Sequence, residues 1–243
     1  MSILQMAEPQ LRYQIKNLSV VCKTFYAICH IPVLWRQWSL TNVGCVRYTK
    51  DSAKSIFEHA EHFRYFFFGG DYYLFDSATA SEYLKRCCNL VSLDIGSNGL
   101  LTDLLFVRGM PKLKRLILDY CHEISPDSII EGLRKTPYLE YLSMMYCQHL
   151  DIQDVLGLAE FLPKLRVLNI EHSFEINHED LHVLLTNMKS LQQLQATPSH
   201  LYSELWFPVM VMHAKVHFGV ALRKTLTRQQ QRIILLSKTC HST

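Results

Sequence analysis

Apolar residues recur along the middle of the chain in a constant order, in which a leucine is followed three and five residues later by further apolar side chains. The four most regular units begin at Leu113, Leu139, Leu165 and Leu191. Their period is 26 residues. A related unit begins 23 residues earlier at Leu90, and another, with phenylalanine in place of leucine, begins 27 residues before that at Phe63. A period this constant predicts stacked copies of one structural unit.

Each unit predicts a short strand followed by a helical stretch. In the unit that begins at Leu113, Leu116 and Leu118 alternate, which places both side chains on one face of a strand. Helix-capping side chains are expected at Ser125, Asp151 and Asn177. Because no unit can bury its own apolar face, the units are expected to stack into a curved parallel sheet with the helices outside.

The units share the pattern L-x-x-L-x-[LIM]-x-x-[CNS], with a small polar residue at the ninth place. These ninth residues are Asn98, Cys121, Cys147 and Ser173. The pattern resembles the leucine-rich-repeat family, in its cysteine-containing class, over about residues 62–196. The resemblance implies an α/β solenoid with the sheet inside and the helices outside. The ninth residue is expected to hydrogen-bond backbone groups at the turn that leaves the strand.

The segment before the repeats carries a second pattern. Residues 18–25 read L-S-x-V-C-K-x-F, and residues 32–35 read P-x-L-W. These residues resemble the second half of an F-box. The Leu-Pro-x-Glu stretch and the first amphipathic helix of that family do not precede Pro9, so the resemblance is to an N-terminally truncated box, as in a splice or start-site variant.

An F-box that runs into leucine-rich repeats is the layout of substrate receptors in SCF-type (Skp–cullin–F-box) ubiquitin ligases. The resemblance implies that the box binds the Skp adaptor of the cullin complex, weakened here by truncation, and that the repeats bind a protein substrate. The adaptor-binding residues implied are Leu18, Val21, Cys22, Phe25, Pro32, Leu34 and Trp35. The structural alternative is that this half-box caps the apolar edge of the first repeat.

Alternation along the predicted strands directs every second side chain to the concave face of the solenoid. The predicted substrate-binding residues are Tyr65, Phe67, Asp94, Arg115, Ile117, Asp119, Tyr141, Met145, Asn169 and Glu171. Exposed aromatic and aliphatic side chains of this kind are typical of binding hot spots. The acids on this face favour a partner segment that is basic or neutral and carries an apolar anchor.

Composition and motifs narrow the function. The chain has 49% hydrophobic residues and a net charge of +3, which disfavours disorder and gives no reason to expect nucleic acid. The sequence contains no G-x-S-x-G motif and no Gly-rich phosphate loop, and a non-enzymatic role without cofactors is expected. Cys121, Cys147 and nearby histidines line up between repeats, but we expect a structural role for these cysteines and no metal. With no signal-like start, reduced thiols and a cytoplasmic or nuclear location are expected.

The predicted organisation has three parts. Residues 1–40 form a partial helical F-box-like segment, residues 41–200 the solenoid, and residues 201–243 an atypical tail. That tail contains several Lys and Arg and a single acid, Glu204. It is interpreted as a capping helix with a frayed end, as sequence introduced by alternative splicing, or as a membrane-surface segment. The functions considered are therefore a ligase substrate receptor, a truncated repeat scaffold without adaptor binding, and a membrane-associated protein, although a membrane is not expected.

Overall fold

The computed structural model describes residues 22–24, 27, 31–39, 54, 56–67 and 76–198 of the 243-residue chain. Its strands are β1 (Gln37–Ser39), β2 (Tyr65–Phe67), β3 (Ser92–Asp94), β4 (Arg115–Ile117), β5 (Tyr141–Ser143), β6 (Val167–Ile176) and β7 (Gln193–Pro198). Its α-helices are α5 (Ser77–Leu84), α6 (Pro126–Leu133), α7 (Ile152–Leu158) and α8 (His178–Asn187). Its 3-10 helices are η2 (Pro32–Trp35), η3 (Ala60–His62) and η4 (Leu105–Gly109).

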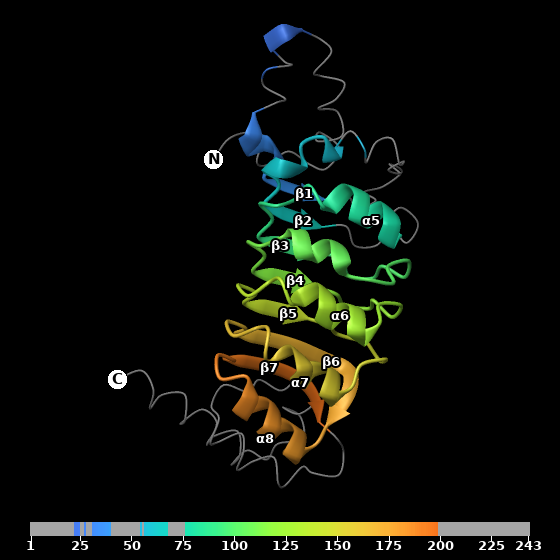
Figure 1. Ribbon diagram of the computed structural model, residues 1–243, viewed down its shortest axis with the longest axis vertical. Helices are drawn as coiled ribbons and strands as arrows, with labels where there is room; N and C mark the ends of the chain where they lie inside the picture. The colour runs from blue at the N-terminus through green and yellow to red at the C-terminus, as the bar shows by residue number, and fades with distance from the viewer. Residues whose placement is uncertain are drawn as a thin grey trace, which may run out of the picture.

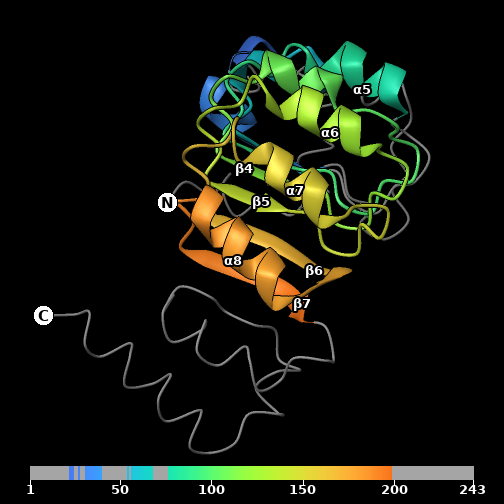
Figure 2. The same cartoon turned by 60° about the horizontal axis from the view of Figure 1, so that its bottom comes forward.

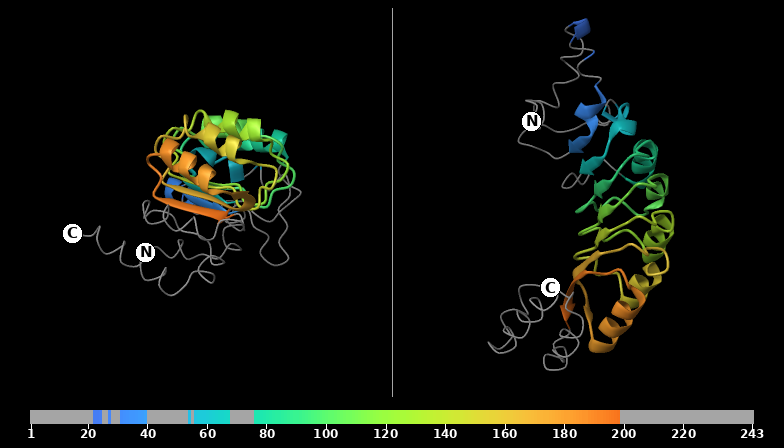
Figure 3. Two further views of the ribbon diagram at one scale, coloured as in Figure 1. Left: turned by 90° about the horizontal axis from the view of Figure 1, so that it is seen from below. Right: turned by 90° about the vertical axis from the view of Figure 1, so that its left-hand side faces the viewer.

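The strands form one seven-stranded parallel sheet whose spatial order is the order of the chain (Figure 1). The helices follow one another in a row along the other side of the stack (Figure 2). In side view the stack is curved, with the strands on the inner side and the helices on the outer side (Figure 3). This arrangement confirms the α/β leucine-rich-repeat solenoid expected from the sequence.

The repeated leucines set the register of the sheet. Leu93 pairs with Leu116, which pairs with Leu142, and the series continues to Leu168 and Leu194. All five side chains are buried, so they form a continuous core between the sheet and the helices. Phe66 takes the same place in β2 and is buried too, which confirms that phenylalanine replaces leucine in the first unit.

The expected helix caps are present. Asp151 and Asn177 each form a capping box with the acid three residues on, Asp154 and Asp180. Ser125 Oγ accepts a hydrogen bond from Ser128 N at 3.3 Å, and Pro126 takes the first helical position. The unit between β3 and β4 differs, because the 3-10 helix η4 stands where the other units have an α-helix. That unit is the short one of 23 residues, which leaves less chain for a helix.

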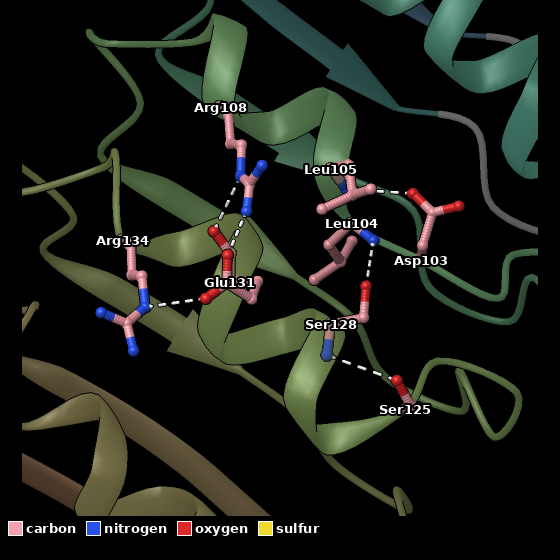
Figure 4. A network of polar contacts seen from close by, with 8 residues as sticks. All are labelled: Asp103, Leu104, Leu105, Arg108, Ser125, Ser128, Glu131 and Arg134. Atoms are coloured by element: carbon pink, nitrogen blue, oxygen red, sulfur yellow. Dashed lines mark hydrogen bonds and ion pairs between the residues drawn. The ribbon is translucent and has the colours of Figure 1, made fainter.

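Polar contacts join this 3-10 helix to α6 on the outer side of the solenoid (Figure 4). Leu104 N donates a hydrogen bond to Ser128 Oγ at 3.0 Å. Glu131 forms ion pairs with Arg108 in one unit and with Arg134 in its own, the latter at 3.1 Å. The backbones also come close at Gly132, where an added Cβ would lie 2.7 Å from the carbonyl oxygen of Leu104. Neighbouring units are therefore locked together on their convex side as well as through the core.

The ninth residues of the repeats hydrogen-bond the backbone as expected. Cys121 Sγ donates to Ile95 O at 3.4 Å, Cys147 Sγ donates to Leu118 O at 3.3 Å, and Ser173 Oγ donates to Met144 O at 2.5 Å. Burial raises the pKa of the Cys121 thiol to about 12 and that of Cys147 to about 11. Both cysteines therefore remain protonated near neutral pH and tie each repeat to the one before it.

The tail at 201–243 lies outside the described residues, as do most of residues 1–30, so the three predicted parts stay a prediction. No helix in the described part of the chain is both long and apolar enough to cross a bilayer.

Candidate functional site

The strands line the inner, concave side of the curved stack (Figure 3). Because side chains alternate along a strand, the first and last residues of each short strand are directed to this face in two rows. The strand pairing places Tyr65, Ser92, Arg115, Tyr141, Val167 and Gln193 in the first row. It places Phe67, Asp94, Ile117, Ser143, Asn169 and Gln195 in the second. The sequence-predicted residues are therefore brought together on one continuous surface.

Two aromatic side chains stand at the amino-terminal end of this surface. Tyr65 is 52% exposed and Phe67 is 36% exposed, whereas Phe66 between them is buried. The Phe66 ring packs against Phe57 and Phe63, with ring centroids 5.3 Å and 5.5 Å apart. The packing of Phe66 against these rings fixes the strand that carries Tyr65 and Phe67. Less conformational entropy is therefore lost when the two exposed rings bind a partner.

The middle of the concave face combines a cation, a ring and a carboxylate. The Arg115 guanidinium lies 3.7 Å from the centroid of the Tyr141 ring, a cation–π arrangement that holds the arginine flat on the surface. Burial raises the pKa of Asp94 above its usual value, and the nearby Asp119 carboxylate adds to the shift while Arg115 opposes it. This part of the face is therefore electrostatically mixed, not uniformly acidic.

Asn169 and Asp119 form hydrogen bonds within the fold that the sequence pattern does not predict. Asn169 is only 7% exposed, and its Oδ1 accepts a hydrogen bond from Glu171 N at 3.0 Å. Asn169 therefore offers little side-chain surface to a partner, and its contact with a substrate stays a prediction. Asp119 is half-buried, and its Oδ1 accepts from both Ser143 Oγ at 2.5 Å and Met145 N at 2.9 Å.

The remaining predicted residues stay on the surface. Ile117, Tyr141, Met145 and Glu171 are each partly exposed. Glu171 also lies 3.9 Å from the imidazole Nε2 of His172. Their participation in substrate binding remains a prediction.

The N-terminal segment departs from the adaptor-binding interpretation at one described position. Trp35 is 5% exposed and stacks on His59 with ring centroids 3.8 Å apart, so its indole packs into the first repeat and is not available to an adaptor. Leu34 packs partly against the same core, whereas Pro32 and Cys22 are exposed. Leu18, Val21 and Phe25 lie outside the described residues. The end of the half-box thus caps the first repeat, which is the structural alternative considered for it.

The residue before each ninth place has a left-handed backbone, which the sequence pattern does not predict. Ser97, Tyr120, Tyr146 and His172 have φ of 62°, 61°, 60° and 61°. The rings of Tyr120 and Tyr146 stack 4.5 Å apart, and those of Tyr146 and His172 stack 4.6 Å apart. Aligning the repeats does show aromatic side chains in this column, but the pattern gives no sign of its backbone conformation.

The ionisable side chains show no metal-binding arrangement in the ranges that the structure describes. Within those ranges no group of three or more His, Cys, Asp or Glu side chains is placed to hold a metal ion. Cys87 is buried, and burial raises the pKa of its thiol to about 12.

Comparisons with known proteins agree with this architecture. No protein-family profile matches the chain. The chain is 31% identical over 93 residues to the DNA repair protein RAD7 of Saccharomyces cerevisiae, covering 38% of this chain and 16% of that protein. It is 24% identical over 163 residues to putative F-box/LRR-repeat protein 23 of Arabidopsis thaliana, covering 67% of this chain and 31% of that protein. The chain thus spans less than a third of the length of either curated relative.

Solved structures with a similar course of the backbone are distant. Rad7 in its complex with Elc1 from yeast has a TM-score of 0.48 and 16% identity, over 74% of this chain and 55% of that one. An internalin of Listeria monocytogenes has a TM-score of 0.45 and 14% identity, over 90% of this chain and 66% of that one. The two curated relatives support the resemblance to F-box/leucine-rich-repeat proteins.

Proposed function

We propose that this leucine-rich-repeat chain is a non-catalytic substrate-recognition subunit of an SCF-type ubiquitin ligase. In this function the concave face binds a protein substrate, and the segment before the repeats contacts a Skp-type adaptor. The curated relative named as an F-box/LRR-repeat protein supports the proposal, as does the sequence resemblance of residues 18–35 to half of an F-box. The chain would act where such a ligase acts, in the cytoplasm or the nucleus.

The observation that carries the proposal is the junction between the half-box and the sheet. Trp35 is buried in the first repeat, and Arg36 O accepts hydrogen bonds from Arg64 N at 2.8 Å and Tyr65 N at 2.9 Å. Strand β1 then pairs directly with β2, which carries Tyr65 and Phe67. A rigid junction of this kind would fix a bound substrate relative to an adaptor, which is what presentation to a separate catalytic subunit requires.

The chemistry of the concave face suits a peptide or loop with an apolar anchor. Tyr65 and Phe67 offer exposed ring area, while Arg115 is already engaged by Tyr141. Asp94 and Glu171 add carboxylates to the polar part of the surface beside Arg115. The expected partner segment is therefore neutral or basic around an apolar residue.

The test compares ubiquitinated peptides in cells that express the chain or its Tyr65→Thr/Phe67→Thr variant. Threonine suits a strand, so the double variant removes the rings while keeping β2. Val183→Thr is the matched control, because Val183 is an exposed apolar side chain on α8 away from the concave face. We expect a set of proteins to lose ubiquitination with the double variant and to keep it with the control. Identical ubiquitination in all three cell lines would contradict the proposed substrate face.

A second function is favoured by one observation. Leu34 and Trp35 turn towards the repeat core, so two of the residues assigned to the adaptor serve as a cap. This favours a repeat scaffold that binds the same partners without an adaptor. The two functions differ in a measurable property, since the ligase subunit requires adaptor binding by the whole chain and the scaffold does not.

A further inference from the structure

Three aromatic side chains form a ladder along the edge of the solenoid where the strands end. The ladder consists of Tyr120, Tyr146 and His172, which stack at 4.5 Å and 4.6 Å between ring centroids. Each belongs to a different repeat, and backbone hydrogen bonds connect the rungs, from Tyr120 N to Met145 O at 2.9 Å and from Tyr146 N to Glu171 O at 3.1 Å. These backbone hydrogen bonds hold the three residues in register with the neighbouring strands.

The three residues of the ladder adopt a backbone conformation that is unfavourable for their side chains. All three residues have φ near +60°, a region that bulky side chains rarely adopt and that glycine occupies at no steric cost. Residues held in such conformations cluster at ligand-binding and switch sites. Stacking between the rings offsets part of the free-energy cost of the positive φ angles. Stacking alone does not explain why the three aromatic side chains face solvent.

The ladder stops at Tyr120. Ser97 takes the preceding rung, with φ 62° and its N–H bonded to Asp119 O at 2.6 Å, but it carries no ring. Tyr120 is 40% exposed, and the ring of His122 stands edge-on to it at 6.4 Å. The end of the ladder thus presents an aromatic surface beside a small residue.

Two acidic residues, Asp94 and Asp119, lie beside this end. A Cβ added to Gly96 would lie 3.3 Å from Asp94 Oδ1, 3.3 Å from Asp119 O and 3.7 Å from Asp119 Cβ, so both acids border the same glycine. Asp94 Oδ1 accepts from Gly96 N at 3.0 Å, and Asp119 Oδ1 is engaged by β5. The proximity of Asp119 raises the pKa of Asp94, as expected for two like charges in a half-buried position.

The charge of the whole edge is one-sided. The segments on the ladder side of the four repeats, at 94–98, 119–123, 145–149 and 171–175, contain no Lys or Arg. Their acids are Asp94, Asp119, Glu123, Glu171 and Glu175. The opposite edge, where the chain enters the strands, is mainly basic. It carries Arg64, Arg86, Lys112, Lys114, Lys135, Lys164, Arg166 and Lys189, against Glu61 and Glu140, the latter paired with Lys114. A cationic segment is therefore attracted to the ladder edge and repelled from the other.

We propose that the ladder edge is a docking surface for an arginine-bearing segment of a protein partner, with one guanidinium stacked on Tyr120 and paired with Asp94 and Asp119. A guanidinium is planar, stacks on aromatic rings and donates in a fork to carboxylates, which matches this combination better than the compact charge of lysine. The inference rests on the proposed function in taking the occupant to be part of the recruited protein. It extends the recognition surface from the concave face, which carries Asp94, to the ladder edge, and it narrows the partner to one with an exposed arginine.

The test uses the full chain and a fluorescein-labelled peptide in which arginine alternates with serine, read by fluorescence anisotropy. The same peptide with citrulline in place of arginine keeps the shape and removes the charge. Direct binding needs neither adaptor nor ligase, so this experiment can fail while the proposed function stands, and the reverse also holds. We expect saturable binding of the arginine peptide and at least about fivefold weaker binding of the citrulline peptide.

Variants separate recognition from folding. Tyr120→Gly removes the ring at a position where glycine has no backbone strain, and Asp94→Asn removes one charge with little change of shape. Each substitution is expected to weaken binding of the arginine peptide by about fivefold, whereas Tyr120→Phe is expected to bind this peptide within about twofold of the unchanged chain. Tyr138→Ala is the matched control, since Tyr138 is exposed but its ring lies beneath Lys164 on the basic edge. Absence of binding by the full chain, equal binding of the citrulline peptide, or unchanged affinity in Tyr120→Gly would each overturn the proposal.

Discussion

The carboxylate of Asp119 accepts a hydrogen bond from the backbone N–H of Met145 in the next repeat, at 2.9 Å. The same oxygen accepts from Ser143 Oγ at 2.5 Å. One carboxylate oxygen thus accepts hydrogen bonds from two donors of the next repeat. The alternation of side chains along the strand, by itself, would assign Asp119 to the binding face. Asp119 therefore stabilises the contact between two repeats, in addition to the partner-binding role proposed for it.

Asp119→Ala is expected to destabilise the fold by about 2 kcal/mol, because it leaves the Met145 N–H and the Ser143 hydroxyl without their acceptor. Asp119→Asn keeps an acceptor oxygen and is expected to cost less. Urea unfolding followed by circular dichroism measures both. The exposed Glu123→Ala variant serves as control and is expected to stay within about 0.5 kcal/mol of the parent chain. Equal stability of Asp119→Ala and the control would show that these hydrogen bonds do not stabilise the repeat.

The glycines inside α6 and α7 predict opposite outcomes for the same substitution. Gly132→Ala places a Cβ 2.7 Å from the backbone oxygen of Leu104, so α6 must move away from the neighbouring unit. We expect a loss of about 1–3 kcal/mol despite the better helix propensity of alanine.

Gly157→Ala meets only the end of the Ile130 side chain, Cδ1 at 3.4 Å, which can shift by a few tenths of an ångström. In α7 the propensity gain therefore prevails, and a gain of up to about 1 kcal/mol is expected. Thermal unfolding of the two variants side by side measures the difference. A Gly132→Ala variant as stable as Gly157→Ala would contradict the close approach of α6 to Leu104.

The buried thiols predict a loss of stability in alkali. The pKa of Cys121 rises from 9.0 to about 12 and that of Cys147 from 9.0 to about 11, chiefly through burial. Above pH 9 the unfolded chain loses these protons while the folded chain keeps them, so the free energy of unfolding falls as pH rises towards the folded values. At pH 10 each thiol is expected to contribute a loss of about 1 kcal/mol.

Serine at the same places isolates this effect from other groups that titrate in alkali. Ser173 already fills the ninth place in the next repeat and donates to Met144 O, so Cys121→Ser/Cys147→Ser retains the hydrogen bonds without the titration. The decline between pH 8 and pH 10 is expected to be about 2 kcal/mol smaller in the double variant. Parallel pH profiles of the two proteins would show that these thiols are not protonated in the folded state as described.

The sequence predicts the parts of this fold that repeat. Leu116, Leu142 and Leu168 set the register because a one-residue slip would turn every buried leucine to solvent. The sequence also predicts capping residues such as Asn177, because a cap depends only on residues within a single helical turn.

The features that sequence reasoning missed depend on contacts between units. Asn169 is buried by a turn that closes over it, and Trp35 is buried by packing on His59. Neither follows from periodicity, which assigns a face but not the depth of a side chain. The left-handed conformation of Tyr120 is likewise set by the backbone rung between repeats, and the residue type itself argues against it.

Binding of the adaptor by the whole chain tests the proposed function most directly. Isothermal titration of a purified Skp-type adaptor into the full chain measures it, with a protein that carries an intact F-box as positive control. The account predicts saturable one-to-one binding at micromolar concentrations, weaker than the control, because Leu34 and Trp35 are committed to the first repeat. No heat of binding at those concentrations, while the control protein binds, would contradict a ligase subunit and leave the repeat scaffold as the function of this chain.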